Sequence, residues 1–141
     1  MASENDRLTE RVIGLAIEVH RQLGPGLLES AYEECLCYEL AHAELVFRRQ
    51  VALPLVYKSV RLDCGYRLDV VVENRLILEL KTVERLLPIH EAQVITYLLL
   101  SGMPTGLLLN FNSAILKQGI RRLMLSGSSE GGLTALPSHC D

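Results

Sequence analysis

The 141-residue sequence contains no tryptophan, and aromatic residues make up only 5% of it. A hydrophobic core must therefore consist mainly of Leu, Val, Ile and Ala, and no aromatic platform for stacking nucleic-acid bases is evident. Four cysteines are present, but no two of them have the CxxC spacing typical of metal or redox sites. Free thiols in a cytoplasmic protein are the favoured interpretation of these cysteines.

No uninterrupted hydrophobic segment is long enough to cross a membrane. The longest stretch without a charged residue covers 92–116, up to Lys117, and Gln, Ser, Gly, Pro and Asn interrupt it. The N-terminus is polar and acidic, without the apolar segment of a secretory signal. These absences predict a soluble cytoplasmic protein with no membrane partner.

A large excess of positive charge is also missing, because the formal net charge is −3. The charges are unevenly distributed along the chain, however. Residues 1–46 contain three basic and nine acidic residues, whereas residues 47–125 contain eleven basic and six acidic ones. The middle of the chain is thus mildly basic, which permits binding to phosphate groups but is equally typical of a solvated surface.

The length is that of one domain. Hydrophobic periodicity predicts a mixed α/β (α+β) domain over residues 8–125, preceded by a flexible N-terminus (1–7) and followed by a disordered tail (126–141). Turns are expected at Lys58-Ser59 and at Glu73-Asn74. The predicted helices cover 8–23, 27–45 and 88–101, and the predicted strands cover 47–57, 60–72, 75–83, 105–110 and 120–125.

Three charged residues interrupt the apolar strands of the predicted hairpin around Glu73-Asn74. Glu79 and Lys81 are two residues apart and therefore project from the same face of a strand. The turn places Asp69 of the preceding strand close to Glu79. The sequence thus predicts two carboxylates and an amine on one sheet surface.

This combination is suited to metal-assisted hydrolysis. Carboxylates and the backbone carbonyl between Glu79 and Lys81 are oxygen ligands of the kind that Mg²⁺ prefers. A bound ion lowers the pKa of water, and a neighbouring lysine can orient or deprotonate that water. The plainer alternative is a solvent-exposed Glu–Lys pair with an unrelated Asp. Against it stands the cost of placing charges inside apolar strands.

Other polar residues carry weaker signals. Glu29 and Tyr32 lie on one face of a predicted helix after the Gly24-Pro25-Gly26 segment, a pattern that helix punctuation also explains. Gln93 and Tyr97 are one helical turn apart and can hydrogen-bond or stack with a substrate, although core packing equally explains Tyr97. His90, one turn before Gln93, is a candidate neighbour of the site or a structural residue.

Taken in order, these residues resemble the PD-(D/E)xK nuclease superfamily, within it the RecB-like branch and the GxxExxY family. The resemblance covers residues 8–125. It rests on five separated segments: 19–33 (VHRQLGPGLLESAYE), 66–69 (YRLD), 78–81 (LELK), 92–98 (AQVITYL) and 106–111 (GLLLNF). Leu68 stands where the superfamily usually has Pro, and residues 41–44 lack a glycine expected after the second helix.

The resemblance implies a restriction-endonuclease-like core, a mixed β-sheet flanked by helices. It also implies site roles. Asp69, Glu79 and the Leu80 carbonyl would bind Mg²⁺ or Mn²⁺, with Glu29 as an additional metal-side carboxylate. Lys81 and Gln93 would complete the catalytic set. Substrate contacts would come from Tyr32, His90 and Tyr97.

The function that follows is an Mg²⁺-dependent nuclease that hydrolyses phosphodiester bonds, with DNA favoured over RNA. The alternative is a non-catalytic module on the same fold that binds nucleic acid or protein. Because the chain is short and has no dense basic arm, either function would require a homodimer, a partner protein or weak, salt-sensitive binding.

Overall fold

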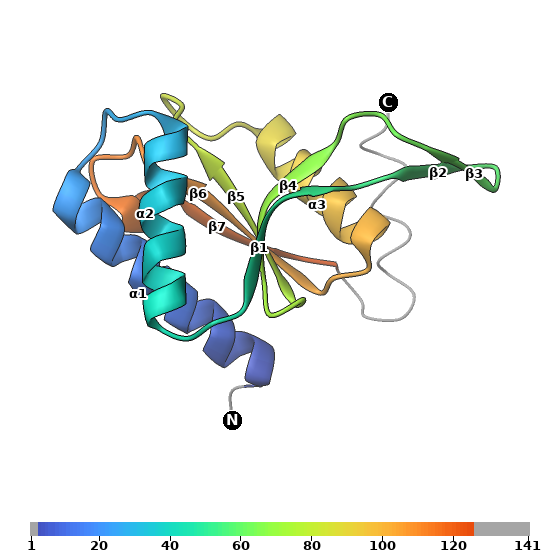
Figure 1. Ribbon diagram of the computed structural model, residues 1–141. Coiled ribbons are helices and arrows are strands. Elements are labelled where there is room, and N and C mark those ends of the chain that lie inside the picture. The colour runs from blue at the N-terminus through green and yellow to red at the C-terminus, as the bar shows by residue number, and fades with distance from the viewer. Residues whose placement is uncertain (1–2, 126–141) are drawn as a thin grey trace.

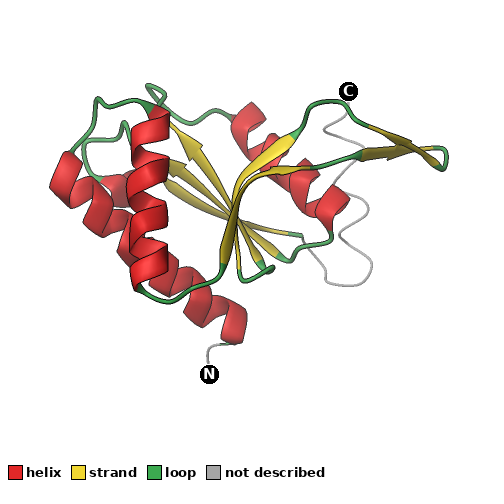
Figure 2. Cartoon of the chain, viewed as in Figure 1, coloured by secondary structure: helices red, strands yellow, loops and turns green. Residues whose placement is uncertain are grey.

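The computed structural model describes residues 3–125, which form three layers, with helices on both faces of one β-sheet (Figures 1 and 2). The order of helices and strands agrees with the sequence pattern, except that two predicted strands are each divided in two. The elements are α1 (Glu4–Leu23), α2 (Glu29–His42), β1 (Phe47–Ala52), β2 (Leu55–Tyr57), β3 (Val60–Leu62), β4 (Arg67–Val72), β5 (Leu76–Lys81), α3 (Pro88–Ser101), β6 (Thr105–Asn110), the 3₁₀ turn η1 (Leu116–Gly119) and β7 (Ile120–Met124).

The main sheet has five strands in the order β1-β4-β5-β6-β7. The β5–β6 pair is parallel and the other three pairs are antiparallel. Helix α3 makes the crossover between the two parallel strands, as such a pairing requires. This mixed sheet flanked by helices confirms the predicted fold class.

Alternate residues of the central strands supply two hydrophobic cores, one on each face of the sheet. On one face, Leu78 and Leu80 of β5 pack with α1 and α2, together with Tyr32 and Phe111. On the other face, Ile77 of β5 packs with α3. Figure 1 shows α1 and α2 together on one side of the sheet and α3 on the other. Burial on both faces explains why β5 and β6 are almost continuously apolar.

The helices begin at different residues from those predicted. Helix α1 starts at Glu4, because Ser3 and Asp6 form a reciprocal capping box at its N-terminus. Residues 4–7, predicted to belong to a flexible N-terminus, are therefore its first turn. Helix α2 covers Glu29–His42 rather than 27–45. Its acidic first residue lies at the positive end of the helix dipole.

The β2–β3 arm (residues 55–62) accounts for the division of the two long predicted strands. These two short strands pair only with each other and project from the main sheet (Figure 1). Lys58 and Ser59 both have positive φ angles, as do Glu73 and Asn74. Two consecutive residues with positive φ are typical of tight hairpin turns. Both predicted turns are thus confirmed.

No helix within residues 3–125 is long and apolar enough to span a membrane. Cys35, Cys37 and Cys64 are free thiols. The predicted disordered tail (126–141) lies outside the described residues.

Candidate active site

Asp69 lies at the point where strand β4 leaves strand β5. The last paired residues of these strands are Val70 and Leu78, so Asp69 comes one step beyond the ladder. Its side chain replaces the missing backbone partner, because Asp69 Oδ2 accepts a hydrogen bond from the Leu80 N–H at 2.9 Å. The carboxylate is thereby anchored to the strand that carries the other two charged residues.

Glu79 is a buried carboxylate, with only 6% of its surface exposed. Its Oε2 atom is 3.5 Å from Lys81 Nζ. The other oxygen, Oε1, is buried and has no hydrogen-bond partner among the described residues. Because burying an unpaired charged oxygen is costly, this position favours either the protonated carboxyl group or a bound cation.

The pKa values of both carboxyl groups show that burial disfavours their charged forms. Burial, followed by the negative charge of Asp69, raises the pKa of Glu79 to about 8. Burial also raises the pKa of Asp69, against the lowering effect of the Leu80 hydrogen bond. The negative charge of Glu33 raises the pKa of Asp69 as well. Carboxyl groups whose pKa values are raised by desolvation and by neighbouring negative charge are a frequent feature of functional sites.

The three residues therefore stand in the order and the geometry that the D…ExK pattern predicts. A family model described as the PD-(D/E)XK nuclease superfamily matches residues 6–123. The chain belongs to the PD-(D/E)XK nuclease superfamily. No curated protein and no solved structure gives a significant match to the chain. Membership indicates a nuclease with a nucleic-acid substrate, and PD-(D/E)XK nucleases generally use divalent metal ions.

The oxygen atoms at this site fit such an ion. Two carboxylates provide hard donors, and one of their oxygens lacks any other partner. Within residues 3–125, however, no group of three or more acidic, His or Cys side chains is close enough to hold a metal together. A metal ion at this position would therefore have to rely on the Asp69–Glu79 pair together with backbone or solvent oxygens.

Glu29 does not join the pair as a third ligating side chain. It is the first residue of α2 and is exposed, although neighbouring atoms displace part of its water. That desolvation and the charge of Asp69 raise the pKa of Glu29, while Lys81 lowers it. Glu29 therefore faces the PD-(D/E)XK centre and influences it electrostatically, and its predicted role as a direct metal ligand is not met by this geometry.

Helix α3 contributes Tyr97 on the opposite side of the carboxylate pair from α2. Tyr97 is buried, and its ring lies edge-on to that of Tyr66, with 6.3 Å between the ring centroids. Burial, together with the charges of Glu79 and Asp69, raises its pKa to about 12. The Tyr97 phenol thus stays protonated and borders the site. Gln93 is one turn earlier and is exposed, with no hydrogen bond to the described residues.

Two of the predicted substrate-contact residues have structural roles instead. The Tyr32 side chain is 0% exposed and stacks on Phe111 with ring centroids 4.6 Å apart. Its hydroxyl donates to the Gly24 carbonyl and accepts from the Leu27 N–H, which fixes the turn before α2. His90 caps α3, because its Nδ1 accepts a hydrogen bond from the Leu87 N–H. The buried Tyr32 side chain is therefore not available to a substrate, whereas the His90 ring is partly exposed and the capping bond uses only its Nδ1 atom.

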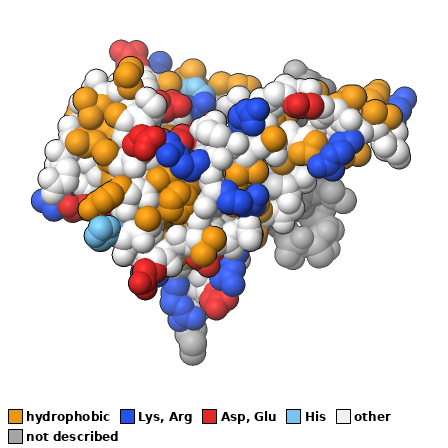
Figure 3. Space-filling model, in the orientation of Figure 1, with side chains coloured by type: hydrophobic (Ala, Val, Ile, Leu, Met, Phe, Trp, Pro, Cys, Tyr) orange, Lys and Arg blue, Asp and Glu red, His pale blue; other side chains and the backbone are white. Residues whose placement is uncertain are grey.

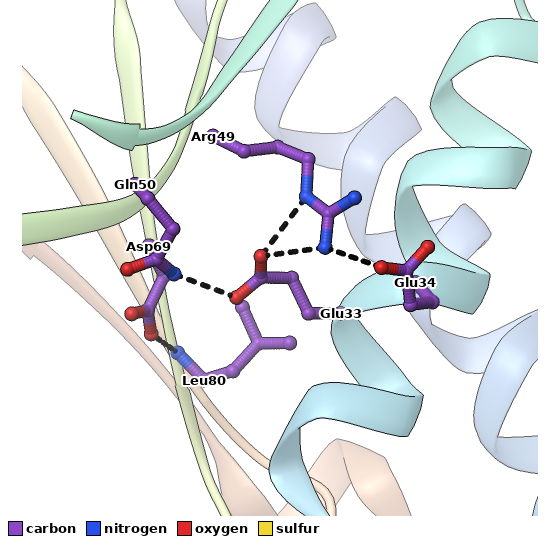
Figure 4. A network of polar contacts seen from close by, with 6 residues as sticks. All are labelled: Glu33, Glu34, Arg49, Gln50, Asp69 and Leu80. Carbon is purple, nitrogen blue, oxygen red and sulfur yellow. Dashed lines mark hydrogen bonds and ion pairs between the residues drawn. The ribbon is translucent and has the colours of Figure 1, made fainter.

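Sequence reasoning missed a polar network beside Asp69, which Figure 4 shows. Glu33 of α2 accepts hydrogen bonds from Arg49 and Gln50 of β1. Its spacing of four residues from Glu29 places it on the same helix face, which is the one signal that could have indicated it. The partners on β1 could not be read from spacing.

Proposed function

We propose that this protein is a metal-dependent nuclease that hydrolyses phosphodiester bonds of DNA. The observation that carries the proposal is the pairing of the partly buried Asp69 with the buried Glu79. Lys81 Nζ lies 3.5 Å from Glu79, and one Glu79 oxygen has no hydrogen-bond partner among the described residues. In a chain of the PD-(D/E)XK superfamily, these are the residues expected for catalysis. Within the superfamily, the segment around Glu29 and Tyr32 supports placement in the GxxExxY family of the RecB-like branch.

Each residue has a role that follows from its surroundings. Asp69, Glu79 and the Leu80 carbonyl would hold Mg²⁺ or Mn²⁺, which offsets the charge that burial makes costly. The chemistry that the bound ion supplies is a water of lowered pKa and stabilisation of charge on the phosphate. Lys81 orients or deprotonates the attacking water, and Glu79 holds the lysine in place. Glu29 adds negative charge beside the centre, and Gln93 and Tyr97 contact the nucleic acid or support the site.

Surface charge supports a polyanionic substrate. Figure 3 shows one face of the molecule. The half of that face that extends toward the β2–β3 arm carries several Lys and Arg side chains and few acidic ones. Such a surface attracts phosphate groups in a salt-sensitive way. DNA is proposed over RNA, and a homodimer or a partner protein would supply the additional grip that one small domain lacks.

One observation favours the second candidate, a non-catalytic module that binds nucleic acid or protein. Lys81 and Glu79 neutralise each other, and no third acidic side chain completes a metal site within residues 3–125. If this ion pair is only structural, the protein binds without cleaving. A single cleavage experiment separates the two candidates.

The experiment measures cleavage of single-stranded DNA, duplex DNA and RNA with Mg²⁺, Mn²⁺ or EDTA. Wild type is expected to cleave DNA only with a divalent ion. Asp69→Asn and Lys81→Met are expected to lower the rate at least a hundredfold while circular dichroism stays unchanged. Lys117→Met, at an exposed lysine, is the matched control and should cleave like wild type. Equal rates for all proteins would identify the activity as a contaminant and reject the nuclease.

A further inference from the structure

Gln50 has a strained backbone directly beside Asp69. It lies in β1 between Arg49 and Val51, which pair with Val70 and Leu68 of β4, so Gln50 faces Asp69 across the ladder. Its φ angle is 50°, in the left-handed region that side chains other than glycine rarely occupy. Such a conformation costs about 1 kcal/mol or more, and it persists only where surrounding contacts hold it.

Glu33 provides those contacts from helix α2. Its Oε1 atom accepts a hydrogen bond from Gln50 Nε2 at 3.0 Å, and its Oε2 atom accepts one from Arg49 Nε at 3.0 Å. Only 8% of Glu33 is exposed. Because both carboxylate oxygens are occupied, Glu33 is not free to bind a metal ion. It acts instead as a fixed acceptor for two adjacent residues of β1.

Gln50 connects this acceptor to Asp69. Figure 4 shows its side chain between Glu33 and Asp69, with the Gln50 amide beside the Asp69 carboxyl group. An amide nitrogen carries two hydrogens, so one side chain can donate to both carboxylates. The Leu80 N–H binds Asp69 Oδ2 from the β5 side. Groups from two strands therefore lie against Asp69, the Leu80 N–H of β5 and the Gln50 side chain of β1. The position of the Gln50 side chain depends on Glu33.

We propose that Glu33 and Gln50 are positioning residues that orient the Asp69 carboxylate for a divalent cation. The inference rests on the proposed function, because it takes Asp69 as a ligand of that ion. Groups that orient metal ligands through hydrogen bonds usually change metal affinity ten- to a hundredfold when they are removed. A residue that merely fastens α2 to the sheet would change stability and leave metal affinity unaltered.

The experiment is calorimetric titration of the metal-free protein with Mn²⁺, which needs no cleavage. Glu33→Gln is expected to weaken Mn²⁺ binding about tenfold, because one of the two donors loses its carboxylate partner. Glu34→Gln is the matched control. Glu34 is the next residue of α2 and pairs with the same Arg49 at 2.9 Å, but it forms no hydrogen bond with Gln50. Its variant should bind Mn²⁺ like wild type.

A second variant covers the case in which Glu33→Gln does not fold. Gln50→Gly keeps the positive φ without strain and removes the whole side chain with its amide, so it should also weaken Mn²⁺ binding about tenfold. The double variant Glu33→Gln/Gln50→Gly should lose no more Mn²⁺ affinity than either single variant, because both substitutions act through the same contact between Glu33 and Gln50.

Two results would overturn the inference in distinguishable ways. Affinities within twofold of wild type for Glu33→Gln and Gln50→Gly, with binding lost in Asp69→Asn, would make the network purely structural and leave the metal site intact. Absence of Mn²⁺ binding in wild type itself would reject the metal site, and with it both the proposed function and the role of the network.

Discussion

Glu79 is the residue whose charge is least favourable in the free protein. Its surroundings favour the neutral acid, because burial and Asp69 raise the pKa to about 8. In an unfolded chain the same group has a pKa of 4.5. Between these values the folded state binds more protons than the unfolded state, so the free energy of unfolding decreases as the pH rises.

The metal-free protein is therefore expected to lose stability as the pH rises from about 4.5 to 8. Each pKa unit corresponds to about 1.4 kcal/mol. Glu79→Gln removes the titration, so its stability relative to wild type should increase over this range and level off above pH 8. Urea unfolding in EDTA at several pH values measures the effect.

Glu84→Gln serves as the control for this titration, because Glu84 is exposed. A Glu79→Gln difference that stays constant from pH 5 to 8.5 would contradict the raised pKa of Glu79.

Individual site residues could be predicted where chemistry and local spacing coincide. Asp69, Glu79 and Lys81 interrupt apolar strands around a recognisable turn, so their meeting could be read from the chain. The roles of Tyr32 and His90 could not, because a buried hydroxyl bonded to a turn and a helix-capping imidazole depend on tertiary contacts. The left-handed conformation of Gln50 has no signature in its own residue type.

At the scale of elements, the contact between α3 and β6 depends on the absence of a side chain. A Cβ atom added at Gly106 would lie 2.6 Å from Val94 Cγ1 of α3. Gly106 also pairs with Ile77 in the β5 strand that carries Glu79. Any displacement of α3 or β6 is thus transmitted to the strand that forms the site.

Gly106→Ala is expected to destabilise the protein by about 1–3 kcal/mol, because overpacking forces the strand and the helix apart. Gly14→Ala should act in the opposite direction. Gly14 is exposed in α1, nothing lies within 4 Å of its added Cβ, and alanine favours a helix by about 1 kcal/mol. Urea midpoints measure both changes. An unaltered midpoint for Gly106→Ala would mean that the Val94 side chain moves aside without lowering the free energy of unfolding.

Element types were predictable because hydrophobic periodicity changes clearly from helices to strands. The division of the long strands was not, since β2 and β3 leave the main sheet although their sequences continue to alternate. Pro54, which has no N–H to donate to a strand ladder, lies between β1 and β2, where the β2–β3 arm begins. The exposed Val56, Tyr57 and Val60 have no periodicity that distinguishes them from core residues.

At the scale of the whole molecule, the net charge of −3 conceals the basic residues of the middle segment. Basic side chains of that segment would replace the counterions on the phosphates of a bound nucleic acid. Part of the acidity lies at the proposed metal site, where a bound cation offsets it. The average charge therefore understates the affinity of the metal-bound protein for nucleic acid.

Binding to duplex DNA should accordingly weaken as salt increases. For about two to four phosphate contacts, the affinity is expected to fall roughly ten- to hundredfold between 50 and 200 mM salt. Fluorescence anisotropy with the Lys81→Met protein and Mg²⁺ measures binding without cleavage. An affinity independent of salt would show that the basic surface does not contact phosphates.

The position of β6 between β5 and β7 also determines when the site can form during synthesis. All of the motif residues from Glu29 to Lys81 leave the ribosome before Thr105–Asn110, which pairs with the whole of β5. At about 5–20 residues per second, the chain needs a few more seconds to reach the end of β7. A nascent chain that stops before β6 therefore contains Asp69, Glu79 and Lys81 but lacks the strand that pairs with β5, so the proposed site is assembled only when the domain is nearly complete.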